Sequence, residues 1–432
     1  MVEATPTSLD LFKKNIVQTA IIDGSWIEIR PINSIEETAP VDFHIDGTSE
    51  DFLDLSETYL KVKARITSAN GENGYPDAEM VAPVNLILQS MWSKLDVSFN
   101  GKRVSSSGHT YPYRAYVEST LNLGSDVKRG QLSASGWHAD TPGHFDTLAA
   151  QNVGFITRKA MGLGRRTISL MGRLHADVFN QNRCLVDGVN VHIQLTRSND
   201  QFCLMKANNV EENYKVKLEE ASLFVRKLKV LPSCRLGIYK ALSSSPLRYP
   251  IRRTEQRVFS ISNNITSWSQ ENVLIGQLPR RMTIGFIRTD AIHGVYNLNP
   301  FHFQHFGINF FSLYINGRQI PSRALQPDFN DANGDYVRTY MQMSSALGHA
   351  FSNQDCGISY DEFRGGTTLF VFNLNAELTD GEHTEAIQRG SVRIETRFSA
   401  ALANPITCLV FSEYDNLILI DKERNVSLDY LV

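Results

Sequence analysis

The chain has 432 residues and a formal net charge of −3 at pH 7. This length suits two domains of about 200 residues each, and 42% apolar with 21% charged residues can build a hydrophobic core. The composition excludes a chain that is disordered throughout, a collagen-like or low-complexity chain, a membrane-spanning apolar run and a bulk nucleic-acid condenser.

The beginning of the chain and its cysteines bear on its compartment. The first 15 residues, MVEATPTSLDLFKKN, lack a basic stretch followed by an apolar core, so we expect no secretory signal. The five cysteines form no CxxC pair. We therefore expect reduced thiols in the cytosol or nucleus, without a disulfide scaffold or a cysteine zinc site. The cysteines are Cys184, Cys203, Cys234, Cys356 and Cys408.

Alternating apolar and polar residues predict antiparallel strands, each with one face in a core, along most of the chain. The clearest cases are residues 58–67, 95–100, 191–195 and 311–316. Many such strands separated by turns are typical of a sandwich or a barrel. Helical patterns are few and short, and they cover Val84–Lys94, Tyr113–Leu123 and Tyr336–Ala346. The longest irregular stretches, 105–165 and 321–366, are either functional surface or cover for one end of a sandwich.

The two halves of the sequence repeat each other. Residues 98–104, SFNGKRV, resemble residues 314–320, YINGRQI, and both contain an Asn-Gly pair suited to a tight hairpin turn: Asn100-Gly101 and Asn316-Gly317. A helical stretch follows each copy, with Tyr113–Val117 matching Val337–Met341. Leu170 then aligns with Phe370, at an offset of 200 residues. This ordered series predicts a duplicated β-sandwich with a junction near residues 225–245.

Several motifs partly resemble metal, phosphate or catalytic sites. His302-Phe-Gln-His305, with His293 nearby, is the best metal candidate, but its context favours a loop that enters a strand and therefore ordinary histidines. Residues 328–335 resemble a calcium loop out of register, and Gly162-Leu-Gly164 lacks a third glycine and a following helix. No GxSxG motif or clear pair of catalytic acids occurs. We expect no catalysis, no cofactor and no bound metal.

Positive charge is concentrated between Lys215 and Arg257, where 11 basic residues face three acidic ones. A solvated strand face with pairing between subunits is the favoured interpretation, and a surface facing a polyanion or an anionic membrane is the alternative. Because aromatic residues are not interleaved here, sequence-specific recognition of nucleic acid is not expected. The candidate basic surface consists of Arg226, Lys227, Lys229, Arg252 and Arg253.

Both ends of the chain carry apolar residues without an obvious strand partner. Such tails either dock onto another molecule or fold back on their own domain. We take them as candidate assembly contacts, namely Leu9, Leu11, Phe12, Ile16 and Val17 at one end, and Tyr430, Leu431 and Val432 at the other.

Two function classes other than a structural protein are alternatives for this sequence. An enzyme on two sandwiches, such as a copper monooxygenase or a glycan amidase, would need clustered His, Met or acidic residues across an interdomain cleft. A glycan-binding module could use Trp92, Trp137 or Trp268 as stacking platforms. Single tryptophans, however, more often belong to a core.

Fragments spread over nearly the whole chain, in a consistent order, carry a resemblance to a known family. The sequence resembles the double-jelly-roll major capsid proteins of Polinton/Maverick elements and adintoviruses, within the tectivirus–adenovirus capsid lineage. The fragments are Ser8–Phe12, Gln18-Thr19, Pro40–Phe43, Asp54-Leu55, Thr58–Val62, Asn100-Gly101, Tyr111–Tyr116, Tyr249-Pro250, Asn299–Phe301, Gly366–Phe370, Tyr414-Asp415, Ile420–Lys422, Arg424–Val426 and Asp429-Tyr430.

The resemblance implies an all-β fold of two tandem eight-stranded jelly rolls with a few short helices in loops. It divides the chain into an N-terminal arm (1–25), a first jelly roll (26–224), a linker (225–245), a second jelly roll (246–420) and a C-terminal tail (421–432). It implies a homotrimer that forms a pseudo-hexameric capsomer of an icosahedral shell around a DNA genome. The partners implied are neighbouring capsomers, penton and minor capsid proteins, and an internal membrane or the genome. The implied location is the virion capsid, with synthesis in the host cytoplasm or nucleus and no secretion.

Overall fold

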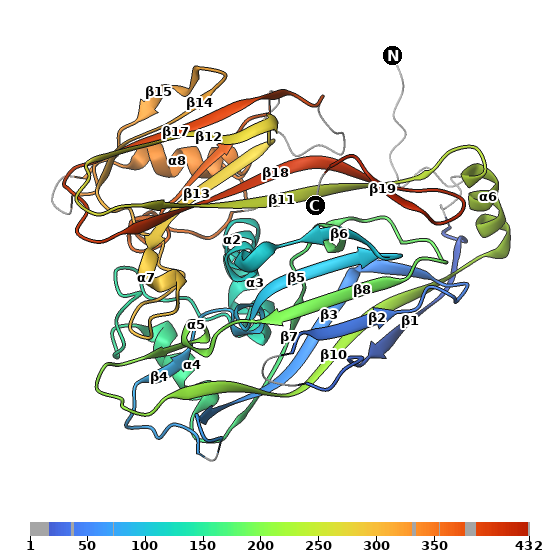
Figure 1. The fold of residues 1–432 in the computed structure, drawn as a ribbon, viewed down its shortest axis with the longest axis horizontal. Helices are drawn as coiled ribbons and strands as arrows, with labels where there is room; N and C mark the ends of the chain where they lie inside the picture. The colour runs from blue at the N-terminus through green and yellow to red at the C-terminus, as the bar shows by residue number, and fades with distance from the viewer. Residues whose placement is uncertain are drawn as a thin grey trace, which may run out of the picture.

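The computed structural model describes residues 17–35, 39–71, 73–330, 334–353, 355–375 and 386–430. The first half of the chain folds into a sandwich of two antiparallel four-stranded sheets (Figure 1). Sheet 1a has the strand order β1-β10-β3-β7, and sheet 1b has the order β2-β8-β5-β6. The strands are β1 (Ile21–Ile29), β2 (Val41–Ile45), β3 (Phe52–Ser68), β5 (Trp92–Phe99), β6 (Lys102–Ser106), β7 (Thr167–Arg173), β8 (Val191–Arg197) and β10 (Tyr214–Val230), with an additional pair β4 (Val81–Pro83) and β9 (Leu204–Lys206).

The second half repeats this arrangement strand by strand. Sheet 2a has the order β11-β18-β13-β16, sheet 2b has the order β12-β17-β14-β15, and β19 adds to β18. The equivalent strands occupy equivalent places in both halves, so the predicted duplication and the double-jelly-roll architecture are confirmed. The strands are β11 (Leu247–Ile261), β12 (Ser267–Gln277), β13 (Arg281–Arg288), β14 (Ile308–Ile315), β15 (Arg318–Leu325), β16 (Leu369–Asn373), β17 (Arg389–Phe398), β18 (Ile406–Ile420) and β19 (Val426–Leu428).

The alternation in the sequence matches the two faces of the strands. In β3, Leu60, Val62 and Ile66 are buried in the core, while Lys61 and Lys63 between them remain partly exposed. The same alternation holds in β5 and β8, as predicted. In β14 it holds only in part, because Phe311 and Leu313 are buried but Ser312 between them is 0% exposed as well. Successive side chains of a strand point to opposite faces, so the spacing of the apolar residues determines which face enters the core.

Each half contains a hairpin with a two-residue turn. Asn100 and Gly101 connect β5 to β6 with φ angles of 47° and 78°. Asn316 and Gly317 connect β14 to β15 with φ angles of 51° and 81°. Both positions of such a turn need positive φ, which asparagine and glycine tolerate better than other residues.

Alanine at position 101 is expected to destabilise the protein by about 1–2 kcal/mol, because a Cβ atom is strained at φ 78° although no atom would clash with it. The matched control is Gly237→Ala in the exposed helix α6 (Pro232–Leu242), where an added Cβ also meets open space. That control should stabilise by about 0.5–1 kcal/mol, because glycine is a poor helix former. Urea unfolding of both variants measures the two effects, and equal shifts in the same direction would contradict the argument.

Two of the three predicted helices are confirmed. Helix α2 (Tyr111–Asn122) follows β6, and α8 (Val337–Ala346) follows β15, so the helices also obey the repeat. The prediction at Val84–Lys94 is wrong, because the helix α1 (Ile87–Ser90) makes one turn before β5 begins at Trp92. Residues 84–92 are all buried, and a run without a polar face does not distinguish a helix from a buried strand.

Further helices lie in the connections between strands. The helices Ser125–Arg129, Val153–Gly162 and Tyr360–Arg364 fall within the stretches 105–165 and 321–366 that the sequence suggested were irregular, and α6 occupies the stretch between the two sandwiches. Strand β10 continues to Val230 and β1 begins at Ile21, so both extend beyond the boundaries suggested by the sequence. These helices are α3 (Ser125–Arg129), α4 (Val153–Gly162), α5 (Asp200–Cys203), α6, α7 (Thr289–Ile292) and α9 (Tyr360–Arg364).

The partly helical connections of the first half and helix α6 lie at opposite ends of the molecule (Figure 1). Figure 1 shows α6 and the C-terminal strand β19 at the right, and α4, α5 and α7 at the left. Strands in a jelly roll alternate in direction, so the connections after β3, β6 and β8 all leave from the same end. One end of the molecule is therefore built from long, partly helical connections.

The two sandwiches share a boundary that buries both faces of β13 and β16 in sheet 2a. In β16, Phe370 and Phe372 belong to the core of the second sandwich. Leu369 and Val371, between them, belong to a larger cluster that continues into the core of the first sandwich. The two halves therefore pack against each other through a shared hydrophobic cluster rather than forming two independent domains.

Candidate functional site

Helix α2 forms the first half's side of the boundary with sheet 2a. A small void between them is lined by Val117 and Leu121 of α2 and by Thr283 and Phe411 of sheet 2a. These two α2 side chains are 5% and 2% exposed. The helix is buried because the second half of the chain covers the face that points away from the first sandwich.

A buried arginine anchors this helix. Arg114 is 1% exposed, and its guanidinium lies 2.7 Å from both the Glu118 and the Asp177 carboxylates. Burial alone would raise the pKa of Glu118, but the charge of Arg114 and the hydrogen bond from His175 lower it to about 2. The Asp177 carboxylate also accepts a hydrogen bond of 3.0 Å from the Thr254 backbone amide, which connects the cluster to β11.

A second buried ion pair connects three segments of the chain. Asp140 and Arg158 side chains are both 0% exposed and lie 2.6 Å apart. The Asp140 carboxylate also accepts hydrogen bonds from the amide of Asn152, at 2.8 Å, and from the amide of Asn299, at 2.9 Å. Because Asn299 precedes β14, this carboxylate fixes the second half on the helical connections of the first.

Aromatic side chains complete the boundary. Phe301 is fully buried and its ring stacks on Tyr116 of α2, with centroids 4.3 Å apart and an interplanar angle of 4°. Tyr113 and Phe202 meet the Phe301 ring edge-on, at 5.7 and 6.0 Å. Offset-stacked and edge-on pairs of this kind stabilise a contact beyond the area they bury.

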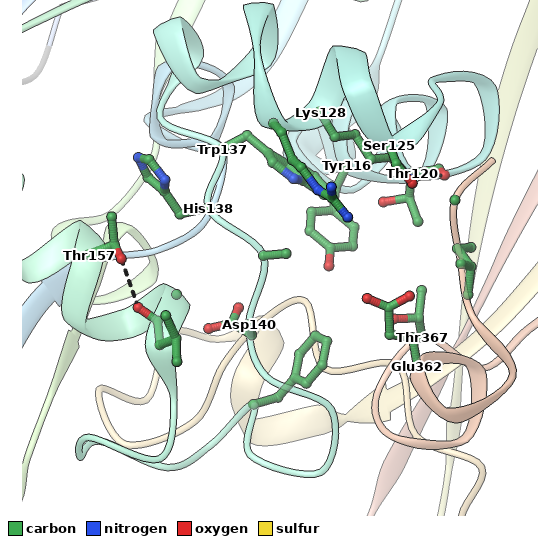
Figure 2. A pocket seen from close by; sticks show the side chains of 17 residues that line it. Tyr116, Thr120, Ser125, Lys128, Trp137, His138, Asp140, Thr157, Glu362 and Thr367 are labelled. Atoms are coloured by element: carbon green, nitrogen blue, oxygen red, sulfur yellow. Dashed lines mark hydrogen bonds between the residues drawn. The ribbon is translucent and has the colours of Figure 1, made fainter. Parts of the chain in front are cut away.

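A cavity of about 330 Å³ lies beside this boundary, lined by both halves of the chain (Figure 2). Lys128 is 8% exposed and donates hydrogen bonds to the carbonyls of Thr120, at 2.7 Å, and Cys356, at 2.6 Å. Its ammonium lies 5.8 Å from the centroid of the Trp137 ring. Burial lowers the pKa of Lys128 to about 8. The cavity combines a lysine and aromatic rings on one side with Glu362 on the other.

Stability is expected to increase with pH between about 8 and 10.5 through Lys128. The unfolded chain keeps this proton up to the ordinary pKa of 10.5, whereas the folded chain releases it near 8. The free energy of unfolding of the native protein, minus that of Lys128→Met, should therefore increase by about 2–3 kcal/mol from pH 7 to pH 10. Urea titrations of both proteins at each pH check this, and parallel pH profiles would contradict it.

The candidate metal residues are engaged in other contacts. The His302 ring lies 2.6 Å from the Asp146 carboxylate, and the His305 ring stacks on Phe329 at 4.4 Å. Residues 331–333 of the calcium-like loop lie outside the described ranges. Within those ranges, no three His, Cys, Asp or Glu side chains gather closely enough to hold a metal ion.

The cysteines and tryptophans belong mainly to the interior. All five cysteines are free thiols, and Cys203, Cys356 and Cys408 are buried. Trp92 and Trp137 are 0% and 6% exposed, so neither offers a surface platform. In the part of the chain that the structure describes, no helix has the length and apolarity needed to cross a bilayer.

The candidate basic residues lie on two different strands. Arg226 on β10 lies 3.6 Å from Asp54, and Lys227 donates a hydrogen bond of 3.2 Å to Ser49. Lys229 and Arg252 are exposed. Arg253 on β11 differs from the surface position suggested for it, because its side chain is 15% exposed and packs against the rings of Tyr414 and Tyr430.

Two of the candidate assembly contacts at the chain ends can be placed. Val17 is 72% exposed. The Tyr430 hydroxyl donates a hydrogen bond of 2.8 Å to the Val104 carbonyl, so this end of the chain lies on the first jelly roll of the same chain. Leu9, Leu11, Phe12, Ile16, Leu431 and Val432 lie outside the described residues.

The residues that connect the two halves were missed as a site by sequence reasoning. Arg114, Asp140 and Arg158 look like ordinary surface charges in the sequence, where nothing marks their burial. A partial signal was present, since the fragments Tyr111–Tyr116 and Asn299–Phe301 carried the family resemblance, and they meet in space.

No family model matches the chain. The uncharacterized protein F54H12.2 of Caenorhabditis elegans is 25% identical over 426 residues, which span 96% of this chain and 99% of that protein.

Solved structures of viral capsids share the fold over the whole length. A chain of the Sputnik virophage has a TM-score of 0.63 at 13% identity, covering 100% of this chain and 94% of its own. The Faustovirus major capsid protein has a TM-score of 0.61 at 9% identity, covering 96% and 93% of the two chains. The mavirus major capsid protein has a TM-score of 0.55 at 12% identity, covering 99% and 95%. The chain therefore has the double-jelly-roll fold of these capsid proteins.

Proposed function

We propose that this chain is the major capsid protein of a virus or of a virus-like transposon of the Polinton/Maverick and adintovirus type. The observation that carries the proposal is the strand-by-strand repeat of one jelly roll within a single chain, in the fold of virophage and giant-virus capsid proteins. A similar chain of nearly the same length in a nematode supports the transposon-borne form of this proposal.

The assembly unit in this proposal is a homotrimer. Three chains with two similar sandwiches each present six similar units around a threefold axis, which is the shape of a pseudo-hexameric capsomer. Contacts between such chains run head to tail and close into a ring, so the trimer is finite. Capsomers then meet one another, with penton and minor capsid proteins at special positions, in an icosahedral shell around DNA.

The protein acts by assembly rather than by catalysis in this proposal. The buried charges at the boundary are paired within the chain, and such pairing fixes the relative placement of the two jelly rolls. A fixed placement suits a building block, because the angle between the two sandwiches then sets the geometry of the ring. The protein is made in the host cytoplasm or nucleus, and its place of action is the virion shell.

Light scattering of the purified full-length protein, followed by electron microscopy, tests the proposal. We expect a mass three times the 48.6 kDa of the chain and particles with a pseudo-hexagonal outline. Co-expression with its minor proteins should give closed shells. A protein that stays monomeric at every concentration measured would overturn the proposal.

A further inference from the structure

We propose that the exposed face of sheet 1a binds the α8 side of the second jelly roll of another copy of this chain. This repeats between chains the contact that α2 makes with sheet 2a within the chain. The inference rests on the proposed capsomer and deepens it by naming the two surfaces that meet.

Sheet 1a is the counterpart of sheet 2a, but among the residues that the structure describes it lacks the cover that sheet 2a has. The offset of 200 residues that relates Leu170 to Phe370 also makes Met171 the equivalent of Val371 in the repeat. Val371 is 1% exposed beneath the first half of the chain, whereas Met171 is 38% exposed. Lys61 is the cross-strand partner of Met171 in sheet 1a, and Thr283 is the cross-strand partner of Val371 in sheet 2a. Lys61 and Thr283 are therefore equivalent positions in the repeat, and Thr283 is 2% exposed.

Helix α8 is the counterpart of α2, and no described segment covers its equivalent side. The repeat of Tyr113–Val117 and Val337–Met341 relates Tyr113 to Val337 and Val117 to Met341. Tyr113 is 3% exposed because Phe301 of the second half packs on it. Val337 is 53% exposed, and Met341 is partly exposed. The same stripe that joins the two jelly rolls within the chain therefore faces outward on the second one.

The exposed face of sheet 1a has the composition of a protein interface. Trp26 is 49% exposed and its ring lies 5.5 Å from that of Tyr59, over which Arg173 packs at 6.0 Å. Aromatic residues, methionine and arginine are enriched in such interfaces and dominate their binding energy. We therefore take Trp26 as the anchor of this face.

The charges of this face favour a protein partner over a polyanion. Lys63 lies 2.6 Å from Glu220, and Arg65 lies 2.8 Å from Glu219. Nearer to Trp26, its cross-strand partner Arg226 lies 3.6 Å from Asp54, and Arg173 lies 3.9 Å from Glu57. These four cations and four carboxylates balance one another. A neutral strip with exposed apolar side chains suits contact with another folded surface.

The partner surface has to come from a second copy. Figure 1 places α8 and β1 at opposite sides of the molecule, so α8 cannot reach sheet 1a of its own chain. A contact between two different surfaces of identical chains is head to tail, which is the arrangement that closes into a ring.

Two single substitutions, one on each surface, test the proposal in the full-length chain. Trp26→Glu places a charge on the face of sheet 1a, and Val337→Glu places one on α8. Each should raise the concentration at which half of the protein is trimeric by about tenfold or more, as measured by analytical ultracentrifugation. Ile275→Glu is the control, because Ile275 is 70% exposed on β12 of sheet 2b, away from both surfaces, and it should leave the trimer intact.

Mixing the two variants separates a head-to-tail contact from a symmetric one. The Trp26→Glu chain keeps an intact α8 side and the Val337→Glu chain keeps an intact sheet 1a face, so one productive contact can form between them. We expect a heterodimer in the mixture and monomers of each variant alone, with unchanged circular dichroism and melting temperature showing that both remain folded.

The remaining outcomes would contradict either the two proposed surfaces or the proposed function. Variants that trimerise like the native protein, or a mixture that stays monomeric, would overturn the proposed surfaces while leaving the capsomer in place. A native protein that does not trimerise would instead overturn the proposed function, and the proposed contact with it.

Discussion

Replacing Asp140 with alanine is expected to lower the free energy of unfolding by about 3–5 kcal/mol. The substitution leaves the guanidinium of Arg158 buried at 0% exposure without its carboxylate. It also removes the acceptor for the side-chain amides of Asn152 and Asn299. A buried charge that loses its partner is far more destabilising than the pair itself is stabilising, which is why the expected effect is large.

The matched control for this substitution is Asp290→Ala. Asp290 lies 2.8 Å from Arg288, but its side chain is 50% exposed. Water replaces the lost partner there, so the expected cost is at most about 1 kcal/mol. Urea unfolding followed by tryptophan fluorescence measures both variants, and similar costs for the two would show that the Asp140 carboxylate is not a structural link.

Phe301→Ala is expected to destabilise the protein by about 3–5 kcal/mol and to loosen the boundary between the two jelly rolls. The ring is fully buried and contacts Tyr116, Tyr113 and Phe202. Its removal leaves a cavity between the halves rather than within either core. Amide hydrogen exchange should therefore accelerate in α2 more than in β13 or β14, whose inner faces belong to the core of the second sandwich.

Phe351→Ala is the matched control, because it makes the same substitution at a phenylalanine whose ring is not buried. Phe351 is 98% exposed, so its removal should change the free energy of unfolding by less than about 0.5 kcal/mol. If Phe301→Ala were as mild as this control, or if exchange accelerated equally in both halves, the aromatic cluster would not hold the two sandwiches together.

Much of the fold could be predicted because its signals are local. The alternation of residues 58–67 reports the two faces of one strand, and an Asn-Gly pair reports one turn. The order of these signals revealed the duplication, which the strand order of the sheets confirms. The predictions at Val84–Lys94 and at α6 fail for opposite reasons. The first segment is buried on all sides, whereas α6 is mostly exposed and has only a weak helical pattern of apolar residues.

The boundary between the jelly rolls could not be predicted, because its signals are not local. Asp140 and Asn299 meet across 159 positions of sequence, and neither residue is unusual in its own neighbourhood. Arg114 is 1% exposed, yet in the sequence it stands in a short amphipathic stretch like any surface arginine. Burial of a charge depends on which segment covers it, and single-sequence patterns carry no information about that pairing.

The dependence of α2 on sheet 2a has a consequence for synthesis on the ribosome. Helix α2 ends at residue 122, whereas β18, which covers it, ends at residue 420. At about 5–20 residues per second, the apolar side of α2 waits roughly 15–60 s for its cover to be translated. During that interval, every nascent chain on one messenger RNA exposes the apolar side of α2, which favours aggregation between them. A chaperone that binds this side of α2 would therefore increase the fraction of chains that fold and assemble.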